Sequence, residues 1–474
     1  MLQTKPFNGN YQQDTLAVRE TLRVEKSYDL KEHRFCLGEK QVSLFFVDGL
    51  VNGEVTEKVM EFLMSLSVEE MAKATDAKTF VKQHVPYLEV DTAADSLAFA
   101  EQIMTGISGL IIEGFQEGVL IELREYPVRS IDEPQNDRVL RGSHDGFVET
   151  LQFNAALIRR RIRDPRLIME NMSIGRRSRT DVVLCYLDGV AKPDQVDTLR
   201  KKLKNITIPA LSLAQESLAE CLNRGQWYNP FPRIRYTERP DAAVASLSEG
   251  RILVMVDNTP AVMIFPTALF DFTQDTNDYY FPPLVGSYLR LVRGVIFCLT
   301  LFLTPLWYLL VKNPEWIPEW LQFLRIQELN EVPLIAQLLI VEVVVDTLKL
   351  ASLNTPTSLS NAFGLIGALI LGEFAVSARL FAQEVLLYMA FVAVATFTQP
   401  SFELGYAFKL SRMMILVLIA LFDLWGFVAG LGIVLLVIVT TKTPLGGYLA
   451  PLVPFDGKAL ARLLWRHPIS RHNS

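Results

Sequence analysis

Hydrophobic positions divide this chain into a polar first part and an apolar second part. The second part contains two runs of 18 uncharged residues, at 294–311 and 385–402, and a run of 28 residues at 413–440 whose single charge is Asp423. An α-helix needs about 20 mostly apolar residues to cross the hydrocarbon core of a bilayer. Because three buried helices of this kind so close together are not expected in a soluble domain, the runs predict transmembrane helices.

Five apolar segments can be drawn in the second part, at 291–311, 333–350, 361–378, 385–402 and 413–440. The predicted fold class is a multi-domain membrane protein. Two cytoplasmic α/β subdomains precede an all-α polytopic transmembrane domain. The predicted divisions are a polar tail at 1–35, α/β subdomain 1 at 36–130, α/β subdomain 2 at 138–280, the transmembrane helical domain at 287–445 and a basic cytoplasmic tail at 446–474.

Alternating strand-like and helix-like patterns support both α/β predictions. In subdomain 1 we expect strands at 42–47, 109–114 and 118–123 and helices at 54–66 and 96–107. In subdomain 2 we expect helices at 145–163, 194–203 and 211–223 and strands at 181–187, 251–257 and 261–265. No internal repeat is evident in the sequence itself.

Composition adds little to this division. The net charge is −6, and the four cysteines (Cys36, Cys185, Cys221 and Cys298) show no metal-ligand spacing, so we interpret them as reduced thiols. The N-terminus lacks the apolar run of a cleavable signal peptide. None of the five histidines lies in an HExxH motif, and the chain has no Walker A loop or GxSxG elbow. We therefore expect no enzyme, no catalytic residues, no cofactor and no metal.

Eight arginines lie between Arg159 and Arg179, against the acids Asp164 and Glu170. Nucleic-acid binding is not favoured, because the cluster has no interleaved aromatic residues and no known motif. Attraction to anionic lipid is an alternative, although over 100 residues separate the cluster from the first apolar segment. The favoured interpretation is that these arginines pair with carboxylates between subdomains or between subunits.

Long collinear stretches resemble the A-subunit family of spore germinant receptors. They include EPQNDRVLRGSHDGFVETLQFNAALIRRRIRDPRL, GRRSRTDVVLCYLDGV, TERPDAAVASLSEGRILVMVDNTPAVMIFP, GLIGALILGEFAVSA, QPSFELGYAFKLSR and GGYLAPLVP, within residues 109–454. The resemblance implies two cytoplasmic α/β subdomains on an oligomeric membrane domain of the spore inner membrane that conducts monovalent cations during germination. It also implies interdomain roles for the motif residues Arg141, Gly142, Asp145, Gly146, Phe147, Glu149, Asn154, Arg159, Arg160, Arg163 and Asp164.

Charge asymmetry predicts the orientation. Arg290 and Arg293 precede the first apolar segment, whereas acids outnumber bases in the loop 312–331 that follows it. This places the first part and the basic C-terminal tail in the cytoplasm, which requires an even number of crossings. Five segments do not satisfy that parity. Either one of them is re-entrant or interfacial, or the segment 413–440 bends back at its glycines, and Lys409 and Arg412 conflict with a simple four-span arrangement.

Ionisable residues within the apolar segments are the candidate ion pathway, because each costs about 2.5–3.5 kcal/mol at a helix centre on insertion scales. The candidates are Glu342, Asp346, Lys349, Glu373 and Asp423. Spacing puts Glu342 and Asp346 on one helical face and allows an Asp346–Lys349 pair, leaving Glu342 without a partner and facing water. The family pattern has two acids and a base here too, but a further acid where this chain has Leu350. Interfacial or interhelical pairing is the alternative to pore lining.

Glycines predict close helix packing. The candidates are Gly364, Gly367, Gly372, Gly426 and Gly430, of which the last two form a GxxxG pattern. The favoured function is an oligomeric cation-conducting subunit in spore germination. Alternatives are a non-conducting signal-transducing or scaffold subunit of a germinant receptor complex and, less favoured, a secondary transporter. Expected partners are the lipid bilayer, further copies of the chain and other germination membrane proteins, without nucleic acid.

Overall fold

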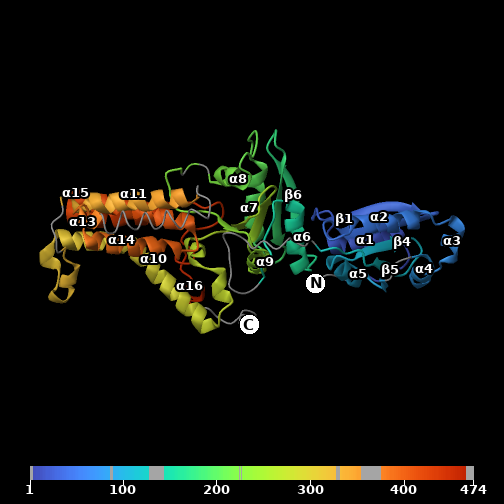
Figure 1. Ribbon diagram of the computed structural model, residues 1–474. Helices are drawn as coiled ribbons and strands as arrows, with labels where there is room; N and C mark the ends of the chain where they lie inside the picture. Colours follow the sequence, from blue (N-terminus) through green and yellow to red (C-terminus); the bar gives the residue numbers. More distant parts are fainter. Residues whose placement is uncertain are drawn as a thin grey trace. The chain divides into compact units, whose positions relative to one another are not determined.

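The chain forms two compact units, each described here by itself (Figure 1). Unit 1 comprises residues 1–224 and 234–267, and unit 2 comprises residues 225–233 and 268–474. The computed structural model describes residues 4–85, 89–126, 143–223, 225, 227–326, 331–353 and 375–465. The division between the units at residue 267 falls before the boundary at 280 that the sequence predicts.

The first half of unit 1 is a five-stranded sheet with helices, in the strand order β1-β2-β4-β5-β3. All of its strand pairs are antiparallel. Its elements in chain order are α1 (Tyr11–Leu22), β1 (Leu30–Leu37), β2 (Lys40–Val47), α2 (Gly53–Met64), α3 (Val68–Lys73), α4 (Ala77–His84), β3 (Val90–Ala93), α5 (Ser96–Met104), β4 (Ser108–Ile112) and β5 (Gly118–Ile121).

The second half of unit 1 is another five-stranded antiparallel sheet, in the order β6-β7-β9-β10-β8. Its elements are α6 (Leu151–Arg161), β6 (Leu167–Ile174), β7 (Thr180–Leu187), α7 (Pro193–Lys204), α8 (Gln215–Leu222), β8 (Arg235–Thr237), α9 (Pro240–Ser248), β9 (Ile252–Val256) and β10 (Val262–Phe265). The sheets are therefore antiparallel, and unit 1 is of the α+β type rather than the expected α/β type, because each strand pairs through hairpins and returning connections.

The two halves of unit 1 share one topology. If the strands of each half are numbered from one to five along the chain, both sheets have the spatial order 1-2-4-5-3. β4 begins at 108 and β9 at 252, and β5 begins at 118 and β10 at 262, so both offsets are 144 residues. Local contacts repeat as well. The Asp14 carboxylate accepts the Asn8 N–H, and the Asn154 side-chain carbonyl accepts the Val148 N–H. Unit 1 is thus an internal structural repeat that the sequence does not reveal.

Residues 4–35 belong to the folded first half of unit 1, where they form α1 and most of β1, and they do not form the polar tail expected from the sequence. Helix α1 begins at a cap in which the Asn10 side chain accepts the Gln13 N–H, and it buries Val18 and Leu22 in the core. Strand β1 pairs with β2 along its whole length. The sequence concealed both elements because α1 carries several polar residues and β1 has an exposed, polar centre.

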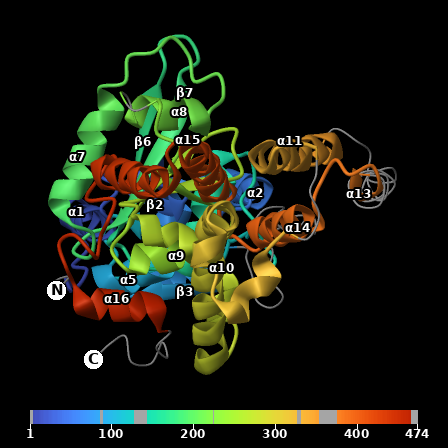
Figure 2. The same cartoon turned by 90° about the vertical axis from the view of Figure 1, so that its left-hand side faces the viewer.

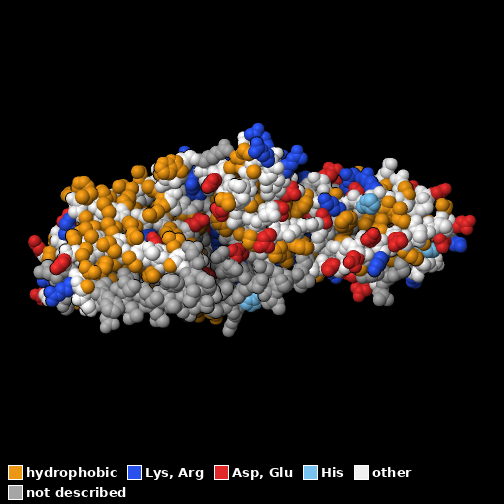
Figure 3. Space-filling model, turned by 45° about the horizontal axis from the view of Figure 1, so that its top comes forward, with side chains coloured by type: hydrophobic (Ala, Val, Ile, Leu, Met, Phe, Trp, Pro, Cys, Tyr) orange, Lys and Arg blue, Asp and Glu red, His pale blue; other side chains and the backbone are white. Residues whose placement is uncertain are grey.

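Unit 2 is helical. Its elements are the 3₁₀ turns η1 (Leu269–Thr273), η2 (Thr276–Tyr279), η3 (Pro314–Trp316) and η4 (Glu319–Leu324) and the helices α10 (Pro283–Lys312), α11 (Leu334–Leu353), α13 (Ala375–Ser377), α14 (Gln383–Phe397), α15 (Phe402–Thr440) and α16 (Gly457–Leu464). Side chains of α10, α11, α14 and α15 share one apolar core. On the face of unit 2 shown in Figure 3, hydrophobic side chains also dominate the surface.

Helix α15 reverses direction at Asp423, where φ is 55° and ψ is −129°. Its two arms, 402–422 and 424–440, are seen as separate coils in Figure 2. They pack closely: a Cβ on Gly426 would lie 1.9 Å from the Leu418 carbonyl oxygen. The predicted bend therefore exists, but it lies at Asp423 and not at a glycine. The glycines permit the two arms to approach each other.

Two helices in the described part of the chain, α10 and α15, are long and apolar enough to cross a membrane. Because α15 is a hairpin, its arms are about 30 and 25 Å long at 1.5 Å per residue. Each arm is therefore a separate candidate for a pass through the roughly 30 Å hydrocarbon core.

Gly426→Ala should destabilise unit 2, because the new Cβ collides with the backbone of the other arm. The expected loss is about 1–3 kcal/mol, as for other overpacked positions. Gly432→Ala is the matched control, since a Cβ there meets nothing within 4 Å and Ala is favoured over Gly in a helix. The measurement is the thermal midpoint of the purified protein in detergent. Equal midpoints for the two variants would contradict the hairpin.

Candidate functional site: a buried charge cluster

The most concentrated buried charge in unit 2 lies between α11 and the first arm of α15. Helix α11 presents Glu342 and Asp346 on one face, and α15 presents Lys409 and Arg412 one turn apart. Arg412 Nε and Nη2 donate to Glu342 Oε1 at 2.8 and 2.5 Å. Lys409 Nζ lies 3.2 Å from Glu342 Oε2 and 2.5 Å from Asp346 Oδ2. Two carboxylates thus meet two cations, and the four charges sum to zero.

Main-chain groups complete the cluster. Lys409 Nζ donates to the Glu342 carbonyl at 2.9 Å, and Arg412 Nη1 donates to the Thr300 carbonyl of α10 at 2.6 Å. The cluster therefore ties three helices together. The Glu342 side chain is 3% exposed and that of Arg412 1%. Removing one member of such a pair typically costs about 3–5 kcal/mol, because the other charge stays buried without a partner.

The geometry corrects the predicted roles of Glu342 and Asp346. Glu342, expected to lack a partner and to face water, is buried against Arg412 and Lys409. Asp346, expected to pair within its own helix, forms an ion pair with Lys409 of α15. Lys349 instead lies over the Tyr406 ring, with Nζ 5.6 Å from its centroid. In the sequence Lys409 and Arg412 conflict with a simple four-span arrangement; in the structure they lie three residues apart on one helical face, opposite two acids that are four residues apart.

Polar atoms without partners lie near the cluster. Asp346 Oδ1, Gln399 Oε1 and Thr304 Oγ1 are buried and have no hydrogen-bond partner among the described residues. Gln399 Nε2 lies 3.4 Å from Thr300 Oγ1, one helical turn from Thr304. Buried acceptors of this kind normally bind water, an ion or another protein group. They give this part of unit 2 a polar interior.

Asp423, another candidate, forms the tip of the α15 hairpin. Its Oδ1 accepts a hydrogen bond from Asn313 Nδ2 at 2.7 Å, and Lys312 Nζ lies 3.7 Å from Oδ2. Lys312 also donates to the carbonyls of Ile419 and Ala420, at 3.0 and 3.1 Å, so it caps the end of the first arm. Asp423 is therefore separate from the cluster. Glu373, Gly364, Gly367 and Gly372 lie outside the described residues.

The arginine-rich motif of unit 1 joins its two halves. Arg159 is fully buried, and its guanidinium binds the Asp29 carboxylate at 2.8 and 3.0 Å. It also donates to Ser27 Oγ at 3.1 Å. Asp29 and Ser27 precede β1, whereas Arg159 lies in α6. This buried charged pair therefore links the two repeats.

Arg160 and Arg163 also reach the first half of unit 1, through Tyr126, whereas the other described residues of the motif have local roles. Arg160 stacks 4.4 Å over the Tyr126 ring, and Arg163 lies 3.5 Å from the Tyr126 hydroxyl. Asp145 binds Arg161 at 2.6 Å, and Asp164 binds Arg166 at 2.7 Å. Gly146 and Phe147 are buried, the Asn154 amide binds the Val148 main chain, and the Glu149 carbonyl accepts the Asn258 N–H. The helix predicted at 145–163 begins at 151 because these side chains stabilise an irregular approach to α6. Arg141 and Gly142 lie outside the described residues.

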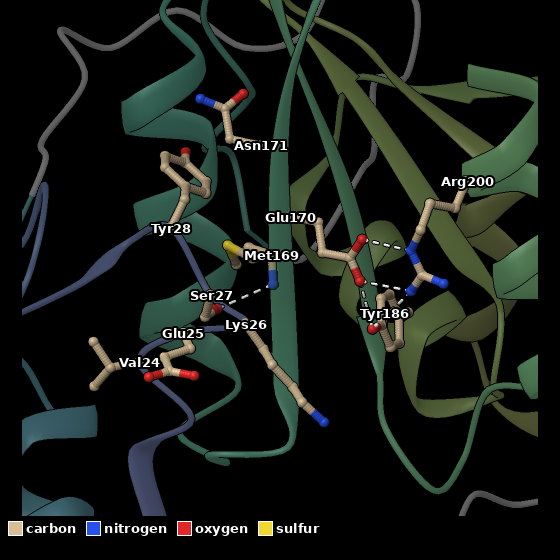
Figure 4. A pocket seen from close by; sticks show the side chains of 10 residues that line it. All are labelled: Val24, Glu25, Lys26, Ser27, Tyr28, Met169, Glu170, Asn171, Tyr186 and Arg200. Carbon is tan, nitrogen blue, oxygen red and sulfur yellow. Dashed lines mark hydrogen bonds and ion pairs between the residues drawn. The ribbon is translucent and has the colours of Figure 1, made fainter. Parts of the chain in front are cut away.

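A cleft of about 500 Å³ lies beside this junction (Figure 4). Its lining residues are Val24, Glu25, Lys26, Ser27, Tyr28, Met169, Glu170, Asn171, Tyr186 and Arg200. Arg200 is held by Glu170 at 2.6 and 2.7 Å, and also by Asp197, so its charge is already neutralised. Burial alone would raise the pKa of Glu170, but hydrogen bonds from Arg200 and Tyr186 outweigh it and lower that pKa.

Within the described ranges, no group of three His, Cys, Asp or Glu side chains is placed to hold a metal ion.

The chain belongs to the Bacillus/Clostridium GerA spore germination protein family, whose pattern matches residues 18–474. Stage V sporulation protein AF of Bacillus subtilis (strain 168) is 36% identical over 441 residues, which cover 93% of this chain and 89% of that protein. Spore germination protein KA of the same organism is 27% identical over 461 residues, covering 95% of this chain and 84% of that protein. The family resemblance in the sequence is thereby confirmed, and these relatives support a role in spore germination.

One solved structure is similar to the first part of the chain. The N-terminal domain of the A subunit of the Bacillus megaterium spore germinant receptor GerK3 is 27% identical, with a TM-score of 0.43. The match covers 55% of this chain and 96% of that one.

Unit 1 should lose stability in acid through Glu170. Since its folded pKa is depressed, its contribution is complete above the unfolded value near 4.5 and is lost as the pH falls through the folded pKa. Glu170→Gln should therefore lower the free energy of unfolding of a 1–267 fragment at pH 7, and its difference from the parent should shrink below pH 4.5. Urea titrations across pH 3–7 measure this. A difference that stays constant with pH would contradict the assignment.

Proposed function

We propose that this chain is a multi-pass membrane subunit of spore germination and that several copies form a channel for monovalent cations. The single observation that carries the proposal is a charge cluster with unpartnered acceptors inside an apolar helical unit. Charged side chains in such surroundings are costly, pair with one another, and are by default a functional-site hypothesis. Membership of the GerA family supports the germination role.

The hairpin of α15 supports an even number of crossings. If each arm is one pass, the five apolar segments supply six passes, with 361–378 counted from the sequence alone. Both ends of the chain then lie on the same side, as the positive charges of Arg290, Arg293 and the C-terminal tail require. On this topology unit 1 is cytoplasmic, and the membrane is the spore inner membrane of the family resemblance.

Asp346, rather than Glu342, is the acid that we assign to the cation path. Its side chain is 31% exposed, and its Oδ1 has no hydrogen-bond partner among the described residues. Glu342 is fully enclosed by Arg412 and Lys409 and holds the helices together. Copies of Asp346 around a central axis would form a ring of acids, which attracts cations as in other cation channels.

A non-conducting role is the second candidate, as a signal-transducing or scaffold subunit of a germinant receptor complex with other germination membrane proteins. The observation that favours it is the neutrality of the cluster, since paired charges hold helices as well as they line a path.

Ion flux from liposomes separates these candidates. Purified protein should release trapped K⁺. Measured per amount of folded protein, Asp346→Asn should reduce the preference for K⁺ over Cl⁻, because Lys409 keeps its pair with Glu342 while the charge at position 346 is lost. Asn keeps the shape and hydrogen-bonding capacity but removes the charge. Glu342→Gln is the matched control, because it should lower the amount of folded protein.

The selectivity of the variant tests the role of Asp346, and the flux itself tests whether the chain conducts. Flux without any change in selectivity in Asp346→Asn would remove Asp346 from the path. No flux from correctly assembled protein, alone or with germination partner proteins, would favour the scaffold role.

A further inference from the structure

Strand β6 of unit 1 has an outer edge that no other strand covers. It is the first strand of the sheet β6-β7-β9-β10-β8, so β7 pairs with it on one side only. Just before β6, the Asp188 N–H donates to the Arg166 carbonyl in the same ladder. This bond places the even-numbered residues of β6 on the β7 side, so the odd-numbered residues direct their N–H and C=O groups outward.

The start of this edge is already paired with the connection between α1 and β1. The Tyr28 N–H donates to the Met169 carbonyl at 2.9 Å, and the Met169 N–H donates to Ser27 Oγ at 3.0 Å. Further along, the outward main-chain groups of Asn171 and Ser173 have no hydrogen-bond partner among the described residues, and both residues are exposed. An edge with free donors and acceptors is a template for a strand of another chain.

Charge protects the corresponding edge of the first sheet but not that of β6. Strand β1 carries Glu32 and Arg34, which form an ion pair at 2.8 Å, and charged side chains on an edge strand oppose pairing with another strand. The single charged residue of β6 is Glu170, and its carboxylate is bound by Arg200 and Tyr186. The edge of β6 therefore lacks the protection that its counterpart has.

The cleft of about 500 Å³ lies along this open edge. Residues 24–28 line one side of it, and residues 169–171 of β6 line the other, as Figure 4 shows. The Tyr28 hydroxyl is buried and has no hydrogen-bond partner among the described residues. Buried polar atoms of this kind normally bind water or another polar group. The cleft thus offers a polar group as well as room beside the free main chain of Asn171.

Exposed cations flank the cleft and the end of β6. One lines the cleft, one lies at the end of α7 and two lie in the turn after β6: Lys26, Lys204, Arg176 and Arg177. The acids that line the cleft, Glu25 and Glu170, are paired with Arg19 and Arg200. The net charge beside the open edge is therefore positive, and the partner that complements it is acidic.

We propose that the open edge of β6, at residues 171–173, is the docking site for an extended acidic segment of another protein. The segment lies beside β6 as an added strand, in line with residues 27–28, and its main chain pairs with Asn171 and Ser173. A second copy of β6 is not the occupant, because it would bring the same cations together. The proposal does not depend on the channel of the proposed function.

Peptide binding to the full-length protein in detergent tests this site. The probe is a rhodamine-labelled hexapeptide of alternating glutamate and valine, a composition that favours an extended strand. Its fluorescence anisotropy should rise to saturation, and the affinity should fall as salt is added. A hexapeptide of alternating lysine and valine should bind at least ten-fold more weakly. Free glutamate should not compete at equal concentration, since it has no strand to add.

Asn171→Pro tests the main-chain pairing. Proline is tolerated where the N–H of an edge strand points away from its neighbour, so the variant should keep the thermal midpoint of the parent. It should nevertheless bind the acidic peptide at least ten-fold more weakly. Cys36→Pro is the matched control. The Asp48 N–H donates to the Asp29 carbonyl, so position 36 also points outward, on β1, and this variant should bind the peptide normally.

Lys26→Glu tests the charge without changing the strand. It should weaken binding of the acidic peptide several-fold and strengthen binding of the lysine peptide. Lys58→Glu, at an exposed position of α2 in the first half of unit 1, makes the same charge change and should do neither.

Three results would overturn the proposal. Normal peptide binding by folded Asn171→Pro would show that the β6 edge is not the site. Equal binding of the acidic and the basic peptide would refute the acidic partner. Self-association of the chain that is lost in Asn171→Pro would make a second copy the occupant.

Discussion

A charged side chain can be buried inside an apolar helical unit when a side chain of opposite charge is buried beside it. This constraint determines how α11 and α15 pack in unit 2. Glu342 brings a carboxylate into the interior on α11, and Arg412 meets it from α15 with two hydrogen bonds. Lys409 bridges the same carboxylate to Asp346. Without these cations α11 would pay the full desolvation cost of two acids, and without the acids α15 would carry two buried cations.

The cluster also determines what the neighbouring elements can do. Arg412 reaches the Thr300 carbonyl, so α10 is tied to the same centre on one side while its other side remains open at Leu284–Val295. At Asp423 the chain reverses direction, so the second arm of α15 runs back beside the first arm. The cluster and the hairpin thus fix the positions of α10, α11 and both arms of α15 within one small helical unit.

Much of this fold could be predicted from the sequence, because buried strands and long apolar helices leave strong periodic signals. The strands at 42–47 and 181–187 and the apolar segment at 294–311 lie where the pattern indicated. Elements with mixed surfaces were missed, among them α1 and β6, since a partly exposed strand or helix has a weak pattern. The repeat in unit 1 was invisible because topology persists when side chains change.

The candidate site could be predicted in part. The acids at 342 and 346 stand out because charge is rare in an apolar segment, but their partners lie more than 60 residues later, and helix spacing reports on neighbours within one helix alone. The reversal at Asp423 depends on Asn313 and Lys312, which approach it from α10. Such long-range contacts are set by tertiary packing, and no local pattern carries them.

The most direct test of the account is the coupling between Glu342 and Arg412. The unfolding free energy of the detergent-solubilised protein should be measured for Glu342→Gln, Arg412→Gln and the double variant. Each single change should cost about 3–5 kcal/mol, because it leaves a buried charge without its partner. The double variant should then cost no more than either single one. If the two costs simply add, the charges do not depend on each other, and the cluster is not what holds these helices together.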